Sequence, residues 1–142
     1  MTERTLLIIK PNVTEKRKIG EVISALETQG FAIREMKMIR WTRGEAERFY
    51  DVHRGKPFFD ALVDFMTSGP IVPMMIEGPE SVGEVRSFIG ATDPAKAAEG
   101  TIRRRYGDSL TRNAVHASDS PENALIEIDR VFGGTGSGPN RA

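Results

Sequence analysis

The sequence predicts an α+β fold in which helices cover a small β-sheet. Three segments have the apolar patterns of strands, at residues 6–9, 31–41 and 71–76, and segments with helical periodicity separate them. The 142 residues contain no internal repeat, and 39% of them are hydrophobic, which suffices for one core. We therefore expect one domain over residues 1–133, followed by a Gly-rich tail over residues 134–142.

The first strand and the first helix have distinct patterns. Residues 6–9, Leu-Leu-Ile-Ile, are apolar throughout and end at Lys10, which is typical of a strand buried on both faces. Apolar residues then recur at helical spacing over 19–29, and Gly30 ends that helix. The mixed pattern of 31–41 predicts a half-exposed strand. Lys10 is therefore expected at the end of a buried strand.

Two helices and a strand are expected in the middle of the chain. Residues 44–53 have a helical pattern, and Pro57 suits the first turn of a second helix that ends at the turn 68–70. The apolar run 71–76 predicts a third strand, but Pro73 lacks the N–H that a β-ladder needs. We therefore expect this strand at a sheet edge or at a bulge.

The last third of the chain has a long segment without clear periodicity between two helices. Residues 80–89 are expected to be helical, whereas 90–120 is rich in Gly, Thr, Asp and Arg, and such long segments are usually functional or disordered. Ser120 is a candidate cap, and Pro121 begins an amphipathic last helix. The tail glycines imitate a phosphate-binding loop, but no strand precedes them and no helix follows. We expect a disordered tail.

Composition argues against several classes of protein. The 20 basic and 20 acidic residues cancel, so no net charge attracts the protein to nucleic acid or to a membrane. Cysteine is absent, which excludes disulfides and thiolate metal sites. The first apolar run is too short for a signal peptide or a membrane span. We expect a cytoplasmic protein without a membrane partner.

His116 is the strongest candidate for catalysis. It lies among small and polar residues just before the last helix, and a neutral imidazole is a good phosphoryl acceptor. At about 100° per residue, Glu127 falls at the margin of the apolar stripe of that helix, from which it could hold the ring of His116. The alternative for Glu127 is a solvated surface carboxylate. His53, the other histidine, has no comparable polar neighbours, and we expect it to be structural.

A phosphoryl-transfer site without a glycine loop needs cations that converge on the phosphates. Lys10, Arg86 and Arg103 lie within or beside segments that end in loops, although a single basic residue is more often a surface charge. The run 103–105, of three arginines, is also compatible with nucleic-acid binding.

An aromatic side chain and a metal ion are the other expected parts of such a site. Phe58 could stack on a base, although its helical spacing with Leu62 fits core packing equally. The sequence contains no evident cluster of metal ligands. Any Mg²⁺ is therefore expected to arrive with the phosphates of a nucleotide.

Five motifs, in this order, resemble those of the nucleoside diphosphate kinases. They are residues 5–12 (Thr-Leu-Leu-Ile-Ile-Lys-Pro-Asn), 68–70 (Ser-Gly-Pro), 90–94 (Gly-Ala-Thr-Asp-Pro), 100–103 (Gly-Thr-Ile-Arg) and 113–120 (Asn-Ala-Val-His-Ala-Ser-Asp-Ser). The likeness covers about residues 4–133. It implies a ferredoxin-like α+β sandwich with a four-stranded antiparallel sheet. It also implies a ping-pong kinase that passes the γ-phosphate of ATP, through a phosphohistidine on His116, to nucleoside diphosphates such as GDP.

The resemblance implies a role for each site residue. His116 is the expected nucleophile, Glu127 orients its ring, Ser118 supports that pair, and Tyr50 lies close to the site. The expected nucleotide contacts are Lys10, Arg86, Thr92, Arg103 and Asn113 at the phosphates and the ribose, with Phe58 and Leu62 at the base. Mg²⁺ is expected with the nucleotide. The protein is expected to be a homo-oligomer, with dimers assembled into a tetramer or a hexamer.

Three departures from the family pattern qualify these expectations. Ala117 stands where glycine is usual, which would cost about 1 kcal/mol if that backbone needs a positive φ. Glu99 replaces a common proline in a loop that the family uses for subunit contacts, and Arg104 and Arg105 make this rim more basic. The rival hypothesis is a non-catalytic nucleotide or nucleic-acid binding module on the same fold. The complete set of site residues favours the enzyme.

Overall fold

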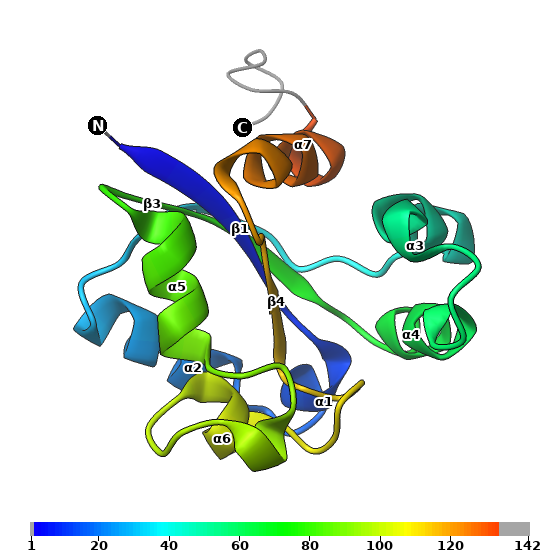
Figure 1. Cartoon of the computed structure of the whole chain (residues 1–142), viewed down its shortest axis with the longest axis horizontal. Coiled ribbons are helices and arrows are strands. Elements are labelled where there is room, and N and C mark those ends of the chain that lie inside the picture. Colours follow the sequence, from blue (N-terminus) through cyan, green and yellow to red (C-terminus); the bar gives the residue numbers. More distant parts are fainter. Residues whose placement is uncertain (1, 134–142) are drawn as a thin grey trace.

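The computed structural model describes residues 2–133, and one antiparallel sheet of four strands lies at its centre (Figure 1). In spatial order the strands are β2 (Ala32–Met36), β3 (Val72–Gly78), β1 (Glu3–Ile9) and β4 (Val115–Ala117). This confirms the α+β fold with a four-stranded antiparallel sheet. The tail predicted to be disordered, 134–142, lies outside the described residues.

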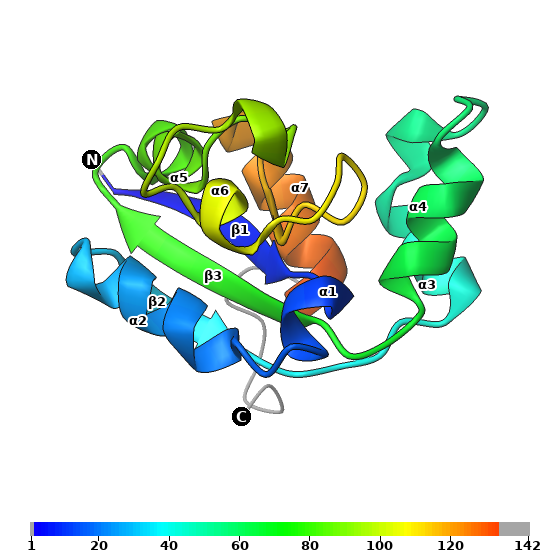
Figure 2. The ribbon, with the colours of Figure 1, turned by 90° about the horizontal axis from the view of Figure 1, so that it is seen from below.

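Helices cover both faces of the sheet (Figures 1 and 2). They are α1 (Pro11–Thr14), α2 (Ile19–Thr28), α3 (Arg43–Phe49), η1 (Asp51–His53), α4 (Phe59–Met66), α5 (Ser81–Ile89), η2 (Pro94–Lys96), α6 (Ile102–Tyr106) and α7 (Pro121–Phe132), where η marks a 3₁₀ helix. Helices α3 and α4 lie side by side at one end of the molecule. Within the part of the chain that the structure describes, no helix is long and apolar enough to cross a membrane.

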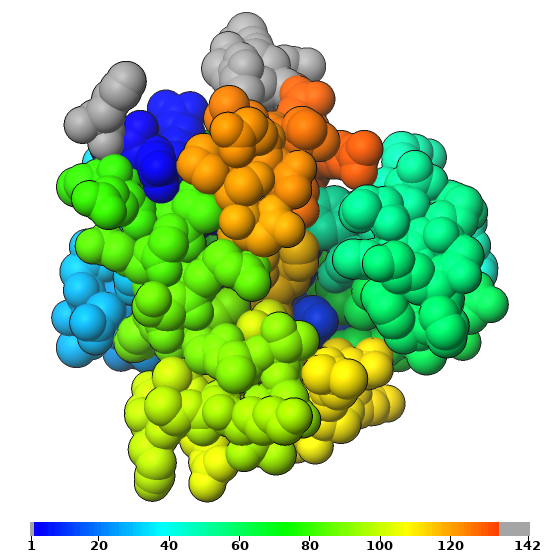
Figure 3. Space-filling view, in the orientation of Figure 1, coloured from blue at the N-terminus to red at the C-terminus, as the bar shows by residue number. Residues whose placement is uncertain are grey.

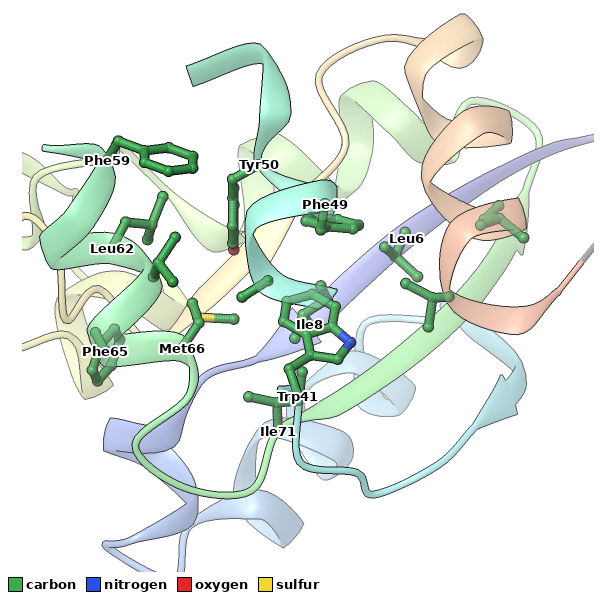
Figure 4. Packing of buried hydrophobic residues seen from close by; sticks show 14 of the residues in the cluster. Leu6, Ile8, Trp41, Phe49, Tyr50, Phe59, Leu62, Phe65, Met66 and Ile71 are labelled. Atoms are coloured by element: carbon green, nitrogen blue, oxygen red, sulfur yellow. The ribbon is translucent and has the colours of Figure 1, made fainter. Parts of the chain in front are cut away.

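The central strand β1 divides the core into two clusters. Its side chains alternate between the faces, so Leu6 and Ile8 pack with α3, α4 and α7, whereas Leu7 and Ile9 pack with α2, α5 and α6. All four side chains are fully buried, as the continuous apolar run predicts. Figure 4 shows the first cluster, in which Tyr50 and other aromatic side chains fill the space between β1 and α4. This packing fixes the end of β1, where Lys10 is the N-cap residue of α1.

The predicted edge position of the strand with Pro73 is wrong. β3 lies in the middle of the sheet, between β1 and β2. Lys37 N donates to Pro73 O at 3.2 Å, but proline has no N–H for the reciprocal bond. The side of Pro73 that lacks an N–H faces Lys37, just beyond the end of β2, where no β-ladder continues. A central strand can therefore contain proline at this position. An irregularity in register lies in β2 itself, between Ile33 and Glu35.

The predicted strand 31–41 is too long for the same reason. β2 ends at Met36, opposite Met74, and the next residue faces the proline of β3. Beyond it only one isolated bridge forms, between Ile39 and Ile71. A short edge strand that ends opposite a proline is one of the ways in which proteins limit edge-to-edge pairing.

Other boundaries differ by a turn or less. Helix α4 begins at Phe59, so Pro57 precedes the helix and Phe58 occupies its N-cap. Residues 44–53 form α3 followed by η1. The aperiodic segment 90–120 contains η2, α6 and β4, each too short to have a detectable period.

Helix α7 begins as its sequence predicts. Ser120 Oγ accepts a hydrogen bond from Asn123 N at 3.1 Å, and Pro121 is the first helical residue. The helix ends at Gly133, whose φ of +77° lies in the left-handed region that favours glycine. This capped helix lies over β1 and places Glu127 against β4.

Candidate active site

A pocket of about 310 Å³ lies where the ends of β1 and β4 meet the α3–α4 pair and the segment 107–112. Figure 3 shows a hollow between these parts. The residues that line it are Lys10, Tyr50, His53, Phe58, Leu62, Thr92, Arg103, Leu110, Thr111, Asn113 and His116. Two larger and more open grooves, of about 610 and 600 Å³, lie beside α2 and α5 and contain none of the predicted site residues.

The imidazole ring of His116 is held by the carboxylate of Glu127. β4 pairs His116 with Ile8 of β1, and His116 Nε2 lies 2.9 Å from Glu127 Oε1. Ser118 Oγ donates to the same oxygen at 2.7 Å and accepts a bond from Leu6 N at 3.3 Å. Of the two alternatives that the sequence left open for Glu127, the structure therefore has the one in which its carboxylate holds the ring of His116, and the solvated alternative is wrong.

These contacts determine the charge of Glu127 and the tautomer of His116. Burial alone would raise the pKa of Glu127, but the hydrogen bonds from His116 and Ser118 outweigh it and hold the pKa below its ordinary value. An ionised carboxylate accepts a hydrogen from Nε2, so the hydrogen of a neutral His116 resides there. Nδ1 then carries a free lone pair.

Aromatic rings fix the plane of the imidazole. Phe49 and Tyr50 approach His116 edge-on, with ring centroids 5.2 and 6.0 Å away. Trp41 packs behind Phe49 at 5.0 Å. Burial and the charge of Glu127 raise the pKa of Tyr50 well above its ordinary value, so its hydroxyl keeps its proton. Tyr50, expected close to the site, therefore limits the ring of His116 to a narrow set of orientations.

Two buried cations lie in the pocket without a carboxylate among the lining residues. Lys10 and Arg103 are each 6% exposed. Burial, with the charge of Arg103, lowers the pKa of Lys10 to about 7. Burial, with the charge of Arg86, lowers the pKa of Arg103 to about 10. Buried charges are normally paired, so this arrangement is suited to an anionic ligand.

Hydrogen bonds to uncharged groups hold these cations in place. Lys10 Nζ donates to Asn113 Oδ1 at 2.8 Å, and Asn113 Nδ2 donates to Thr92 O at 3.0 Å. The guanidinium of Arg103 donates to Gly90 O at 3.1 Å and to Val115 O at 2.9 Å. The predicted set Lys10, Thr92, Arg103 and Asn113 is therefore brought together at the floor of one pocket.

Arg86 does not line the pocket, unlike the other predicted nucleotide contacts. Its guanidinium donates to Ala117 O at 3.1 Å, beside β4. Its charge still acts on Arg103, whose pKa it lowers, and on Asp119, whose pKa is also held down, mainly by a hydrogen bond from Asn123. Arg86 thus contributes to the positive potential from the rim.

His53 is part of the pocket, which the sequence did not reveal. Its ring stacks near Tyr50 at 6.3 Å and meets Phe58 edge-on at 5.2 Å. Burial, with the charge of Lys56, lowers the pKa of His53. Because η1 follows α3 directly, no periodicity indicates that this side chain turns toward His116.

Leu110 and Thr111 are the other lining residues that sequence reasoning missed. Leu110 is 61% exposed and Phe58 is 45% exposed, so two large apolar side chains of the pocket are open to solvent. Exposed apolar surface of this kind suits a flat ligand such as a nucleobase. The core-packing alternative for Phe58 is therefore wrong, whereas Leu62 is buried and packs in the core as well as lining the pocket.

The pocket also contains polar atoms without partners. Among the described residues, five buried side-chain nitrogen or oxygen atoms lack a hydrogen bond, and three belong to lining residues: Tyr50 Oη, His53 Nδ1 and Arg103 Nε. Buried polar groups are nearly always satisfied in folded proteins. Their concentration here fits a pocket that is completed by a polar ligand.

Backbone strain occurs near His116, at Ala114, and the condition under which Ala117 would carry a cost is not met. Ala117 belongs to β4, pairs with Leu7 and has no positive φ, so its replacement of a glycine carries no such cost. Ala114 has a φ of +80° and is fully buried. Its carbonyl accepts a bond from Lys10 N at 2.8 Å. The strained residue thus joins the strand of His116 to the end of β1.

The three consecutive arginines do not form one basic surface. Arg103 turns into the pocket, Arg104 donates to Ala95 O at 3.2 Å, and Arg105 lies over the ring of Tyr106 at 4.9 Å. Nucleic-acid binding by this run needs guanidinium groups that face a common phosphate backbone. The geometry therefore gives that alternative no support.

The chain is similar to one family throughout this fold and site. Residues 3–136 match the model of the family described as nucleoside diphosphate kinase. A nucleoside diphosphate kinase of Staphylothermus marinus is 53% identical over 131 residues, which cover 92% of this chain and 93% of that one. One of Chlorobium luteolum is 54% identical over 130 residues, with coverage of 92% and 93%.

Solved structures give the same result. The Aquifex aeolicus nucleoside diphosphate kinase has a TM-score of 0.91 and 44% identity, over 94% of this chain and 97% of that chain. A halophilic nucleoside diphosphate kinase of Halobacterium salinarum, solved in complex with CDP, has a TM-score of 0.90 and 39% identity, over 94% and 90%.

Proposed function

The chain belongs to the nucleoside diphosphate kinase family, and we propose that His116 carries the phosphoryl group in its reaction. The enzyme is a phosphotransferase that passes the γ-phosphate of a nucleoside triphosphate to a nucleoside diphosphate. The observation that carries the assignment is the contact of 2.9 Å between His116 Nε2 and Glu127 Oε1. It leaves Nδ1 as the nucleophilic nitrogen in a pocket lined by cations.

The two half-reactions use the same nitrogen. In the first, the lone pair of Nδ1 attacks the γ-phosphorus, the bond from phosphorus to the bridging oxygen breaks, and the nucleoside diphosphate leaves with the bonding electrons. Glu127 stabilises the positive charge that develops on the ring of His116. In the second, a terminal oxygen of another nucleoside diphosphate attacks the phosphorus, and His116 leaves as neutral imidazole.

The cations of the pocket stabilise charge on the transferred group. Lys10 and Arg103 are positioned by neutral partners, so their charge is available to phosphate oxygens. Thr92 and Asn113 supply polar groups at the same floor. Arg86 adds positive potential from the rim.

Mg²⁺ fits this site as part of the nucleotide. Within residues 2–133 no three His, Asp or Glu side chains are arranged to hold a metal, and no carboxylate lines the pocket. Lining groups of this chemistry suit the phosphate oxygens rather than the metal. When bound with the nucleotide, Mg²⁺ neutralises charge on the phosphate oxygens.

Phe58→Ala is expected to weaken nucleotide binding without selecting among bases. An exposed aromatic face stacks on any base, and such stacking contributes about 1–3 kcal/mol. KM should therefore rise about tenfold or more for ATP, GTP and CTP alike. The turnover number at saturating nucleotide should change little, because His116 and Glu127 lie on other elements. Steady-state kinetics with the three nucleotides measure this, and a loss confined to one base would contradict it.

Nucleotide binding at pH 8 is expected to take up a proton on Lys10. Its pKa of about 7 leaves most of it uncharged at pH 8, and an anionic phosphate beside it raises the pKa. Calorimetry in two buffers of different ionisation enthalpy should detect this uptake, which should vanish in Lys10→Met and fade at pH 6. Uptake that survives in Lys10→Met but disappears in His53→Asn would assign the proton to His53 instead.

The experiment that tests the proposal follows the phosphoryl group. The protein is incubated with γ-labelled ATP and Mg²⁺, isolated, and then mixed with unlabelled GDP or UDP. We expect acid-labile label on the protein that moves onto the added diphosphate. A protein that binds ATP but takes up no label would support the non-catalytic binding module instead.

Assembly and location belong to the same proposal. Met36 ends the edge strand β2 and Met38 follows it, and both are more than half exposed. This apolar edge supports the dimer-based oligomer that the resemblance implies. The cytoplasmic location stays a prediction.

A further inference from the structure

The segment 107–112 forms one wall of the pocket without regular structure of its own. It supplies Leu110 and Thr111 to the lining, and Asn113 follows it directly. Backbone bonds from Asp108 N and Ser109 N to Arg112 O close it into a loop. A loop without a ladder depends on its neighbours for its position. The contacts that dock this loop therefore determine the shape of the pocket.

Asn12 of α1 provides the central contact. Its side chain is fully buried, and Nδ2 donates to Tyr106 O at 3.2 Å, Asp108 Oδ2 at 3.0 Å and Arg112 O at 3.0 Å. The two hydrogens of the Asn12 amide are thus shared among three acceptor oxygens, which lie at the two ends of the loop. In Figure 1 the loop, coloured yellow, lies beside α1. One amide group therefore closes the base of the loop against the helix.

Two ion pairs join the loop to the residues that follow α1, but they are exposed. Lys16 Nζ lies 2.6 Å from both carboxylate oxygens of Asp108, and Arg112 Nη1 lies 3.4 Å from Glu15 Oε1. All four side chains are 40% exposed or more. Exposed ion pairs contribute little and are screened by salt. The buried amide is therefore the dominant polar contact that docks the loop.

Asn12 is also two residues from Lys10, so one short segment serves both the loop and the catalytic floor. Lys10 Nζ donates to Asn113 Oδ1 at 2.8 Å, and Lys10 N donates to Ala114 O at 2.8 Å. Asn12 thus holds Arg112, and the next residue along the chain, Asn113, accepts the hydrogen bond from Lys10. Asn12 Oδ1 is buried without a partner, which costs stability. Such an unsatisfied group calls for a reason other than stability alone.

We propose that Asn12 is a positioning residue, which docks the loop 107–112 so that the pocket wall and Asn113 are in place before the nucleotide binds. Asn12 does not line the pocket and acts only through the loop. The inference rests on the proposed function, since it concerns the affinity of the same pocket. It does not involve His116 or Glu127, which β4 and α7 hold independently of the loop.

Asn12→Ala tests the inference, because a positioning residue of the pocket wall should change KM and leave kcat nearly unchanged. KM for ATP and for GDP should rise about tenfold, equivalent to about 1.4 kcal/mol, because binding must now order the loop. The turnover number at saturating nucleotide should stay within about twofold, because the nucleophile is unmoved. The rise of Tm on adding nucleotide should shrink in parallel.

Two variants at the surface keep the test valid if the buried change harms folding. Asp108→Ala removes one acceptor from a partly exposed site, and KM should rise by about two- to threefold. Asp108→Asn keeps an oxygen for Asn12 Nδ2 while it breaks the pair with Lys16. Its KM should therefore stay near that of the wild type, which separates the amide contact from the ion pair.

Ser81→Ala is the matched control. Ser81 is also fully buried, and its Oγ donates one bond, to Glu3 O at 3.0 Å, at the opposite end of β1 from Lys10. It should lose stability with KM unchanged. If Asn12→Ala behaves like Ser81→Ala, with a lower Tm and wild-type KM, Asn12 is merely structural and the inference is wrong. A wild type that takes up no label from ATP would instead overturn the proposed function.

Discussion

His116→Ala is expected to take up no label from γ-labelled ATP and to lose transfer to GDP by about 10⁴-fold or more. The reason is geometric, because within residues 2–133 no other histidine is held by a carboxylate as His116 is by Glu127. The lining cations remain in the variant, so nucleotide binding should persist. The measurements are label on the isolated protein, steady-state transfer and the Kd for nucleotide.

His53→Ala is the control, because His53 lines the same pocket and is the only other histidine in the sequence. It should keep the label. The fluorescence of Trp41, the single tryptophan, gives a second readout, since its ring packs on Phe49, which contacts His116. Label that persists in His116→Ala and disappears in His53→Ala would reverse the assignment.

The sequence was sufficient to predict those helices and strands that have a sustained hydrophobic pattern or a capping residue. The buried strand before Lys10 and the capped helix after Ser120 follow from local chemistry, and the structure has both. β4 has only three residues, so it has no period to detect, and only the family resemblance implied a fourth strand. The central position of Pro73 was hidden for another reason. Whether a missing N–H is harmful depends on where the neighbouring strand ends, which is a tertiary property.

The same division applies to the site. Helical geometry made Glu127 a candidate, because it fixes the direction of this side chain relative to the apolar face of α7, but it left a solvated carboxylate equally open. His53 and Leu110 could not be found in this way, because η1 and the loop 107–112 have no repeating geometry from which a side-chain direction follows. Whether Ala117 carries a cost could not be decided from the sequence, because the cost depended on its φ, and the left-handed residue is Ala114, three positions earlier. A backbone angle of one residue depends on how the strand joins the loop, and a motif does not encode it locally.

Glu127→Ala is expected to slow formation of the phosphoenzyme by about 10²–10⁴-fold while label still accumulates on His116. The carboxylate holds the hydrogen of Nε2 and stabilises the charged ring, so without it the other tautomer competes and the transition state loses a partner. Ser118, whose hydroxyl donates to the same carboxylate oxygen, cannot replace it, because a neutral hydroxyl does not supply the negative charge that the ring loses. Rapid-quench measurement of the first half-reaction separates this loss from any change in nucleotide affinity.

Glu127→Gln removes the charge of the side chain and keeps its shape. The difference in stability between wild type and this variant should depend on pH in a defined direction. The amide keeps an oxygen for the ring, so its rate should lie between those of wild type and Glu127→Ala. Because the folded-state pKa of Glu127 lies below 4.5, the ionised form stabilises the fold above about pH 4.5, and this contribution is lost as pH falls through the folded pKa. Thermal unfolding should therefore show wild type losing its advantage over Glu127→Gln only below pH 4.5. An advantage that disappears near neutral pH, or a wild-type labelling rate in Glu127→Ala, would mean that Glu127 does not act on His116 as an ionised partner.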